Sequence, residues 1–138
     1  MISSESALDA ILELVQKKKK QKINIEDCTN RILANDLIAK HSQPQVNTSA
    51  MDGYAIKLAD KIPGAKLKVV GESAAGKNFN GKLGVNEAVR IFTGAPLPIG
   101  GEAVVIQEDI TTVNNPIIIN QKFETNNFVR RMGSDFRK

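Results

Sequence analysis

Short apolar runs separated by turn-forming residues occupy the chain from about residue 41 onward, and they limit the folds it can adopt. Glycine, proline, asparagine and serine interrupt the sequence roughly every 10 to 15 residues, which leaves room for one short strand at a time. A helix needs a longer periodic stripe, so this pattern is typical of an all-β module. The apolar runs that we expect to form strands are residues 66–70, 88–92, 103–106, 117–119 and 128–129.

The N-terminal segment has a different pattern, with one apolar stripe at helical spacing. The stripe recurs at i, i+3, i+4 and i+7 and consists of Leu8, Ile11, Leu12 and Val15. Ser3 or Ser4 can cap this helix, and a lysine cluster lies at its end, formed by Lys17, Lys18, Lys19, Lys20 and Lys22. The sequence therefore predicts one amphipathic helix that packs its stripe against another element.

A short arm links this helix to the β region. Residues 22–26 alternate between apolar and polar, as a strand does, and residues 31–34 are compatible with one helical turn. Asn30 precedes that turn, and asparagine tolerates the left-handed backbone region. We expect an α+β chain that is mostly β, with a helix and strand arm over residues 1–45 and a compact β domain over residues 46–135.

Composition argues against several classes of function. Aromatic residues make up only 4% of the chain and tryptophan is absent, which argues against stacking on single-stranded nucleic acid. The only cysteine, Cys28, allows no internal disulfide, and it cannot form a metal site with the single histidine, His41. No apolar run reaches about 18 residues and no signal-peptide pattern is present, so we expect no membrane partner and a cytoplasmic protein.

The net charge of +4 leaves one alternative open. Much of the excess lies in the lysine cluster, where cations can complement the C-terminal dipole of a helix. The same lysines are compatible with a patch that binds nucleic acid or phosphate. Salt-dependent binding to a random oligonucleotide would distinguish the two interpretations, and we expect no nucleic-acid partner.

The stretch of residues 49–55 places polar side chains around a turn. Its centre is Asp52-Gly53, a strong turn signal that is compatible with a hairpin on which Tyr54 packs. The same arrangement can present a carboxylate outward, where it can act chemically. The local sequence leaves both interpretations open.

Two further stretches could contact anions. The strand expected over residues 88–92 runs into Thr93-Gly94 and then two prolines, a rigid loop that suits oxyanion binding or simply ends the strand. Near the C-terminus, Arg130 and Arg131 are consecutive, so on a strand they point to opposite faces. At most one of these guanidinium groups can then contact a given phosphate or molybdate-like anion.

Together these stretches resemble the molybdopterin molybdotransferases of the MoeA/gephyrin family. The shared motifs are Ser-Ala-Met-Asp-Gly-Tyr-Ala from Ser49, Thr-Gly-Ala-Pro-Leu-Pro from Thr93 and Arg-Arg-Met-Gly-Ser-Asp from Arg130, in the family's order and spacing. The resemblance covers essentially the whole chain, as the N-terminal part of a longer protein. It implies that residues 46–135 form a β domain inserted into a partly irregular arm, and that residues 136–138 begin the return of that arm.

The resemblance also implies an activity. Family members take adenylylated molybdopterin and molybdate, cleave the adenylate with the help of a divalent metal such as Mg²⁺, and leave molybdenum on the dithiolene. They form homodimers, and a molybdopterin adenylyltransferase is the expected upstream partner. Their molybdopterin-binding Gly-Gly-x-Ser-x-Gly loop does not occur in this sequence, so we expect the chain alone to be inactive. The alternative is a gephyrin-like scaffold or protein-interaction module without catalysis.

The family motifs imply roles for individual residues. The residues that match the family's catalytic positions are Asp52, Thr93 and Asp135. The residues expected to contact the anionic substrate are Arg130, Ser49 and Gly94. Carboxylates suit metal binding, so Asp52 and Asp135 are also the candidate ligands of Mg²⁺. Three positions depart from the family pattern, because Thr48 replaces a usual asparagine, Ser134 replaces a common acidic residue and Asn30 replaces a usual glycine.

Overall fold

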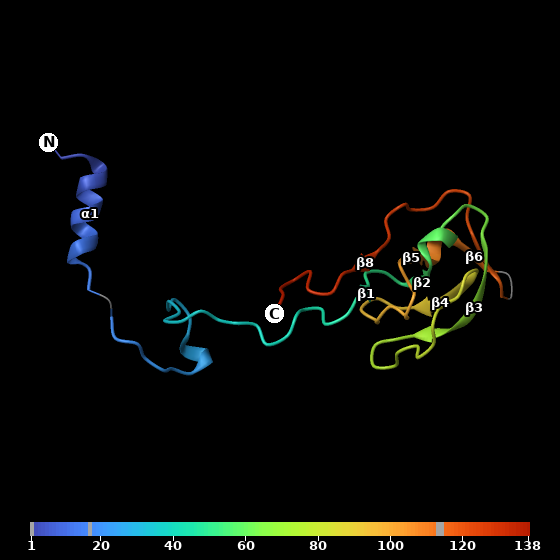
Figure 1. Ribbon diagram of the computed structural model, residues 1–138, viewed down its shortest axis with the longest axis horizontal. Coiled ribbons are helices and arrows are strands. Elements are labelled where there is room, and N and C mark those ends of the chain that lie inside the picture. The colour runs from blue at the N-terminus through green and yellow to red at the C-terminus, as the bar shows by residue number, and fades with distance from the viewer. Residues whose placement is uncertain (1, 17, 113–114) are drawn as a thin grey trace. The chain divides into compact units, whose positions relative to one another are not determined.

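The computed structural model describes residues 2–16, 18–112 and 115–138 (Figure 1). Its contacts divide the chain into two compact units, Met1–Leu37 and Ile38–Lys138. The predicted domain limits at residues 45 and 135 stay predictions. A mostly β chain with one N-terminal helix is confirmed, and no helix among the described residues is long and apolar enough to cross a membrane.

The helix of the first unit is α1 (Ser4–Leu14), and its start agrees with the sequence pattern. Ser3 caps it, because its hydroxyl oxygen accepts a hydrogen bond of 3.1 Å from the backbone N–H of Ser6. Its last turn contains no basic residue, so the lysine cluster follows the helix rather than capping it; Lys17 lies outside the described residues. The predicted stripe is 56–63% exposed at Leu8, Ile11, Leu12 and Val15.

The rest of the first unit differs from the predicted arm. The strand expected over residues 22–26 is wrong, because a 3-10 helix, η1 (Ile25–Asp27), begins within it and Cys28 N–H closes its turn on Ile25 O. The turn expected over residues 31–34 is not helical. The left-handed conformation expected of Asn30 is confirmed by its φ of 62°. A strand needs a hydrogen-bonded partner strand, and the described part of this unit contains no strand that residues 22–26 could pair with.

A six-stranded sheet forms the main part of the second unit (Figure 1). Its strands are β2 (Gly53–Ile56), β3 (Lys66–Ser73), β4 (Glu87–Ile91), β5 (Ala103–Ile106), β6 (Ile110–Thr112) and β7 (Ile117–Ile119). Their order is β5-β2-β4-β3-β7-β6, and neighbours are antiparallel except for β3 and β4. Two short 3-10 helices, η2 (Leu58–Asp60) and η3 (Gln107–Asp109), follow β2 and β5.

A second, two-stranded sheet pairs distant parts of the chain. In it, β1 (Thr48–Ser49) runs antiparallel to β8 (Val129–Arg130). Five of the six predicted strands are therefore present, whereas β1, β2 and β6 were not predicted. The stretch read as a hairpin is not one, since β1 and β2 belong to different sheets.

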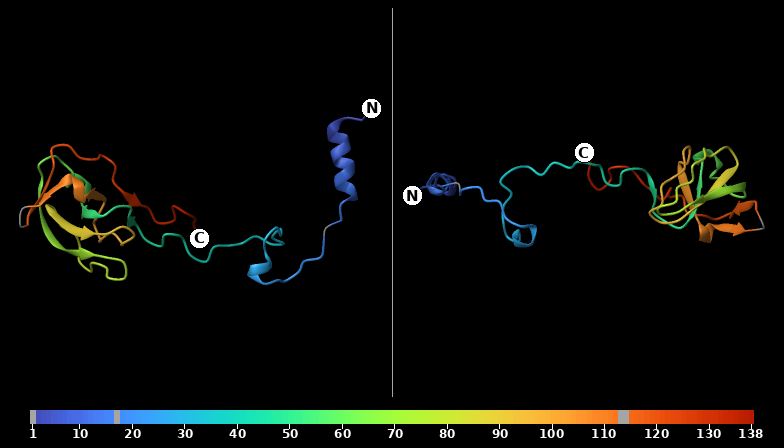
Figure 2. Two further views of the ribbon diagram at one scale, coloured as in Figure 1. Left: turned by 180° about the vertical axis from the view of Figure 1, so that it is seen from behind. Right: turned by 90° about the horizontal axis from the view of Figure 1, so that it is seen from below.

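The larger sheet has an apolar core on each of its two faces. On one face, residues of the edge strand β5 pack in one cluster with residues of β7, which lies next to the other edge, so the sheet curls around this cluster, as Figure 2 shows from two further sides. The cluster contains Ile56, Leu67, Ala88, Ala103, Val105, Ile117 and Ile119. The opposite face carries a smaller cluster of Ala55, Ile91, Ala95 and Val104. Strand residues alternate between faces, so β2, β4 and β5 contribute to both clusters.

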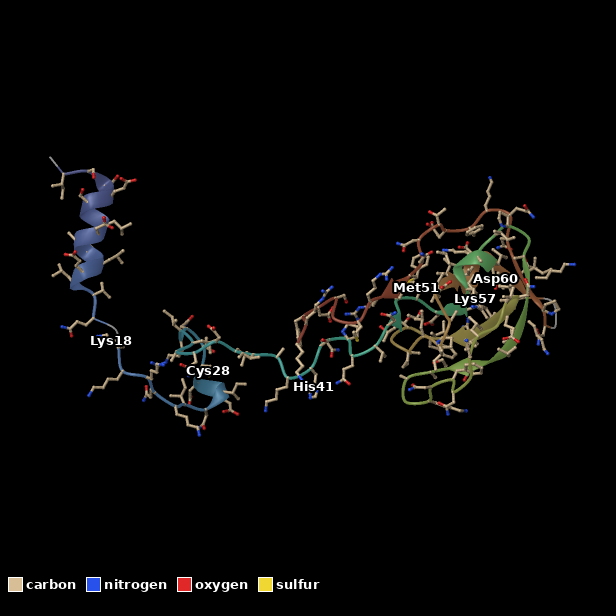
Figure 3. All side chains as sticks on the ribbon, in the orientation of Figure 1. Lys18, Cys28, His41, Met51, Lys57 and Asp60 are labelled. Carbon is tan, nitrogen blue, oxygen red and sulfur yellow. The ribbon has the colours of Figure 1, made fainter. Side chains whose placement is uncertain are left out.

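One buried carboxylate connects the segment after β2 to the segment before β4. Asp60, at the end of η2, is 7% exposed, and its Oδ2 accepts a hydrogen bond of 3.0 Å from Asn86 N–H, just before β4 (Figure 3). This contact holds the exit of β2 against the entry to β4. In the other unit, the Cys28 thiol is free and exposed.

Candidate functional site

The candidate site begins where β2 starts and β4 ends. These strands are antiparallel neighbours with Gly53 opposite Ile91, so the residue before β2 and the residues after β4 meet at one end of the sheet. Asp52 Oδ1 accepts hydrogen bonds of 2.8 Å from both the backbone N–H and the hydroxyl of Thr93. The structure thus joins two of the predicted catalytic residues directly.

These hydrogen bonds favour the ionised form of Asp52. The N–H of Thr93, followed by its hydroxyl, holds the pKa of the Asp52 carboxyl below its usual value, because both donors favour the ionised form; burial opposes this and the Arg90 charge adds to it. At neutral pH the group is therefore a carboxylate. It can accept a proton or bind a cation, but it has no proton to donate.

Gly94 extends the same cluster. Its N–H donates a hydrogen bond of 2.8 Å to Ser49 O, and its φ is 83°. Nothing lies within 4 Å of the position that a Cβ would occupy, so this position needs glycine for its backbone conformation and not for lack of space. Both Thr93 and Gly94 are exposed, so the loop presents polar groups to solvent.

Ser49 is buried, unlike the exposed residues Thr93 and Gly94. It is fully buried, its hydroxyl donates to Met51 O, and its N–H donates to Ala95 O at 2.9 Å. These bonds shape the turn that carries Asp52. The contact with substrate expected for Ser49 stays a prediction.

Arg130 and Asp135 form a second cluster. Nη2 of Arg130 lies 2.9 Å from each carboxylate oxygen of Asp135, and the two side chains are 51% and 40% exposed. The Ser134 hydroxyl also donates to Asp135 Oδ1, at 3.3 Å. An exposed ion pair contributes only about 0–1 kcal/mol to stability, so the fold does not depend on it.

The two clusters are connected through the small sheet. In the β1–β8 register Ser49 pairs with Val129 and Thr48 pairs with Arg130, so Arg130 lies beside the strand that leads to Asp52. Asp52 is bonded to Thr93, whereas Asp135 is bonded to Arg130. Among the described residues, no group of three or more His, Cys, Asp or Glu is arranged to hold a metal ion.

Neither Asp52 nor Asp135 lines the hollow that lies beside β8. That hollow measures about 300 Å³ and is lined by Asn47, Leu58, Leu97, Gly101, Glu102, Asn127, Val129 and Arg131. Of the two consecutive arginines, Arg131 lines it and Arg130 does not. Asp52 and Thr93 instead belong to an open surface.

Two residues beside Asp52 were not identified from the sequence. Arg90 Nη1 donates to Gly53 O at 3.2 Å, and Gln107 N–H donates to Asp52 O at 3.2 Å. The available signal was an arginine and a phenylalanine two residues apart just before Thr93, a spacing that places both side chains on one face of an extended segment.

Comparisons with known proteins agree with the sequence motifs. The sequence model of the family described as "MoeA N-terminal region (domain I and II)" matches residues 2–138. A molybdopterin molybdenumtransferase from Haemophilus influenzae is 36% identical over 140 residues, which cover 100% of this chain and 35% of that protein. One from Synechococcus elongatus is 32% identical over 126 residues, with 86% and 31% covered. This chain therefore spans about a third of the length of these relatives.

Solved structures are similar in fold. A molybdopterin biosynthesis MoeA protein from Pyrococcus horikoshii superposes with a TM-score of 0.73 at 32% identity, over 97% of this chain and 36% of that one. A second structure of a MoeA protein from that organism gives a TM-score of 0.81 at 24% identity, over 97% of this chain and 37% of that one. The second comparison bears on the fold alone.

Proposed function

Because this chain belongs to the MoeA N-terminal family, we propose that it supplies part of the active site of a molybdenum-inserting enzyme. The reaction would be that of a molybdopterin molybdenumtransferase, the name that its relatives carry. In this proposal the enzyme transfers molybdenum from molybdate to adenylylated molybdopterin. The cluster of Asp52 and Thr93 is the observation that supports it most strongly.

The chemistry of that cluster suits an adenylate-cleaving step. Asp52 is ionised, and the two donors on Oδ1 fix the orientation of its carboxylate. Its second oxygen, Oδ2, therefore has a fixed direction and can bind a cation or accept a proton. The donors of the Thr93-Gly94 loop already bind Asp52 and Ser49, so their role is to hold the carboxylate in place. Arg130 can bind a tetrahedral anion once it releases Asp135.

Magnesium fits these residues as an ion shared with substrate. Mg²⁺ is commonly held by one or two carboxylates together with substrate phosphates. Asp52 would be the first carboxylate, and Asp135 could be the second only if its ion pair with Arg130 opens. When bound, the ion would neutralise phosphate charge during cleavage. The metal would therefore require substrate oxygens in addition to these side chains.

The open surface around Asp52 fits a composite site. Binding sites for small organic molecules usually enclose most of the ligand, and Thr93 and Gly94 are exposed. We therefore propose that the pterin is enclosed mainly by other protein surfaces and that this chain alone is inactive. We further propose that the intact protein is a cytoplasmic homodimer that receives its substrate from a molybdopterin adenylyltransferase.

A fusion protein would test the function. This chain would replace the equivalent N-terminal third of the Haemophilus influenzae relative, in cells that lack their own molybdopterin molybdenumtransferase. We expect the fusion to restore a molybdenum enzyme, and Asp52→Asn to abolish that restoration at unchanged protein level. A well-expressed fusion that restores nothing would contradict the proposal. A fusion that works equally well with Asp52→Asn would rule out a catalytic role for Asp52.

A further inference from the structure

Arg90 occupies an unusual position at the edge of the candidate site. Its guanidinium carbon lies 5.1 Å from the ring centre of Tyr54 and 4.9 Å from that of Phe92. Tyr54 is its direct partner across β2 and β4, and Phe92 immediately follows the last residue of β4. The planar cation is therefore held by two aromatic rings, an arrangement that favours arginine over lysine.

The hydrogen bonds of Arg90 reach the backbone next to Asp52. Nη1 donates to Gly53 O at 3.2 Å, the carbonyl that directly follows Asp52. Nη2 donates to Gln107 Oε1 at 2.8 Å, and the N–H of Gln107 donates to Asp52 O at 3.2 Å. One guanidinium group thus contacts the carbonyl of Gly53 directly and the carbonyl of Asp52 through Gln107.

The other half of the site is held from the same point. Phe92, on which Arg90 stacks, immediately precedes Thr93, and Thr93 donates both hydrogen bonds to the Asp52 carboxylate. The two backbone segments that must meet for those bonds to form are the start of β2 and the end of β4. Arg90 contacts both segments, although it touches neither the carboxylate nor the threonine hydroxyl through a hydrogen bond.

We propose that Arg90 is a positioning residue: its stacked, forked guanidinium fixes the two backbone segments so that Thr93 holds the Asp52 carboxylate in place before substrate binds. Gln107 acts with it as the second contact on the Asp52 backbone. Preorganisation of this kind matters because a reacting group that is misplaced by about 1 Å can lose about 10²-fold in rate. The inference rests on the proposed function only in taking Asp52 as a reacting group.

The amide proton of Thr93 provides a direct readout in the 138-residue chain. Its NMR chemical shift at neutral pH reports whether Thr93 donates to the carboxylate, and Asp52→Ala marks the shift of the broken bond. We expect Arg90→Met to move this signal toward the Asp52→Ala position. The signals of Ile117 and Ile119, in the core, should stay where they are.

Two further variants separate position from charge. Arg90→Lys keeps the charge but cannot donate in a fork to two acceptors, so we expect it to move the Thr93 signal in the same direction as Arg90→Met. Arg131→Met is the matched control, since it removes an exposed arginine with no hydrogen bond to this cluster, and it should leave Thr93 unmoved. Gln107→Ala removes one acceptor of Arg90 from an exposed position and should give a smaller shift.

The outcomes decide the inference without any activity assay. A Thr93 signal that stays at its original position in Arg90→Met overturns it, and so does one that is fully restored in Arg90→Lys, because charge alone would then suffice. If Arg90→Met does not fold, Gln107→Ala decides, and an unmoved Thr93 signal there overturns the inference. A clear shift combined with a failed fusion experiment would count against the proposed function only.

Discussion

Gly53 lies so close to the main chain of β5 that a Cβ on it would collide with the carbonyl oxygen of Val105. The two residues belong to paired strands, and Gly53 has an ordinary backbone conformation for its position, since its φ is not among the positive ones. The glycine after Asp52 is therefore required by close packing of two strands and not by a turn. Asp52 directly precedes this contact, at the end of the sheet where Thr93 donates to its carboxylate.

Gly53→Ala should destabilise the β domain by about 1–3 kcal/mol, because an added methyl group must push β5 away from β2. The single tyrosine, Tyr54, lies next to the substitution and provides a fluorescence signal for urea unfolding. An unchanged midpoint would show that β5 can move away at no cost, and would contradict this account of the motif.

The stability contributed by Asp52 should depend on pH in one direction. Its folded-state pKa lies below the ordinary value of 3.8, so its contribution is present above that value and is lost as pH falls through the lower, folded value. Urea unfolding of the original chain and of Asp52→Asn at pH 6 and pH 3, taken as rough brackets of that window, would measure it. The difference between the two proteins should shrink at the lower pH; a difference that grows would reverse the sign.

The ion pair between Arg130 and Asp135 should matter to activity and hardly at all to stability. Arg130→Met is expected to change the free energy of unfolding by less than about 1 kcal/mol, since both partners are strongly exposed. In the fusion protein the same change should reduce molybdenum insertion by about 10²-fold, the typical cost of removing one stabilising donor to a developing charge. Arg131→Met is the control, and equal losses in both variants would argue against a specific role for Arg130.

Serine in place of both Leu8 and Leu12 should lower the helix content of α1. The two side chains are 56% and 58% exposed, so the change removes little buried area. We expect the helical circular dichroism signal to fall because leucine is the stronger helix former. A helical signal that stays unchanged would contradict this prediction.

Local sequence patterns were sufficient for part of this structure. The runs at residues 103–106 and 117–119 match β5 and β7. Strands that are buried on both faces consist of consecutive apolar residues, and such short runs are rare in other elements. The start of α1 at Ser3 and the left-handed Asn30 also follow from local chemistry. The strand expected over residues 22–26 failed because alternation alone provides no partner.

The geometry of the candidate site required the tertiary structure. The motifs identified Asp52 and Thr93, but their hydrogen bond joins residues that lie 41 positions apart, and it depends on β2 lying between β4 and β5. The burial of Ser49 and the place of Arg90 also depend on strand order and register. The sequence by itself determined which residues favour strand, helix or turn, because those preferences act between near neighbours. Which side chains meet was decided only by the packing of distant strands, because a one-residue change of register would turn each of them to the other face.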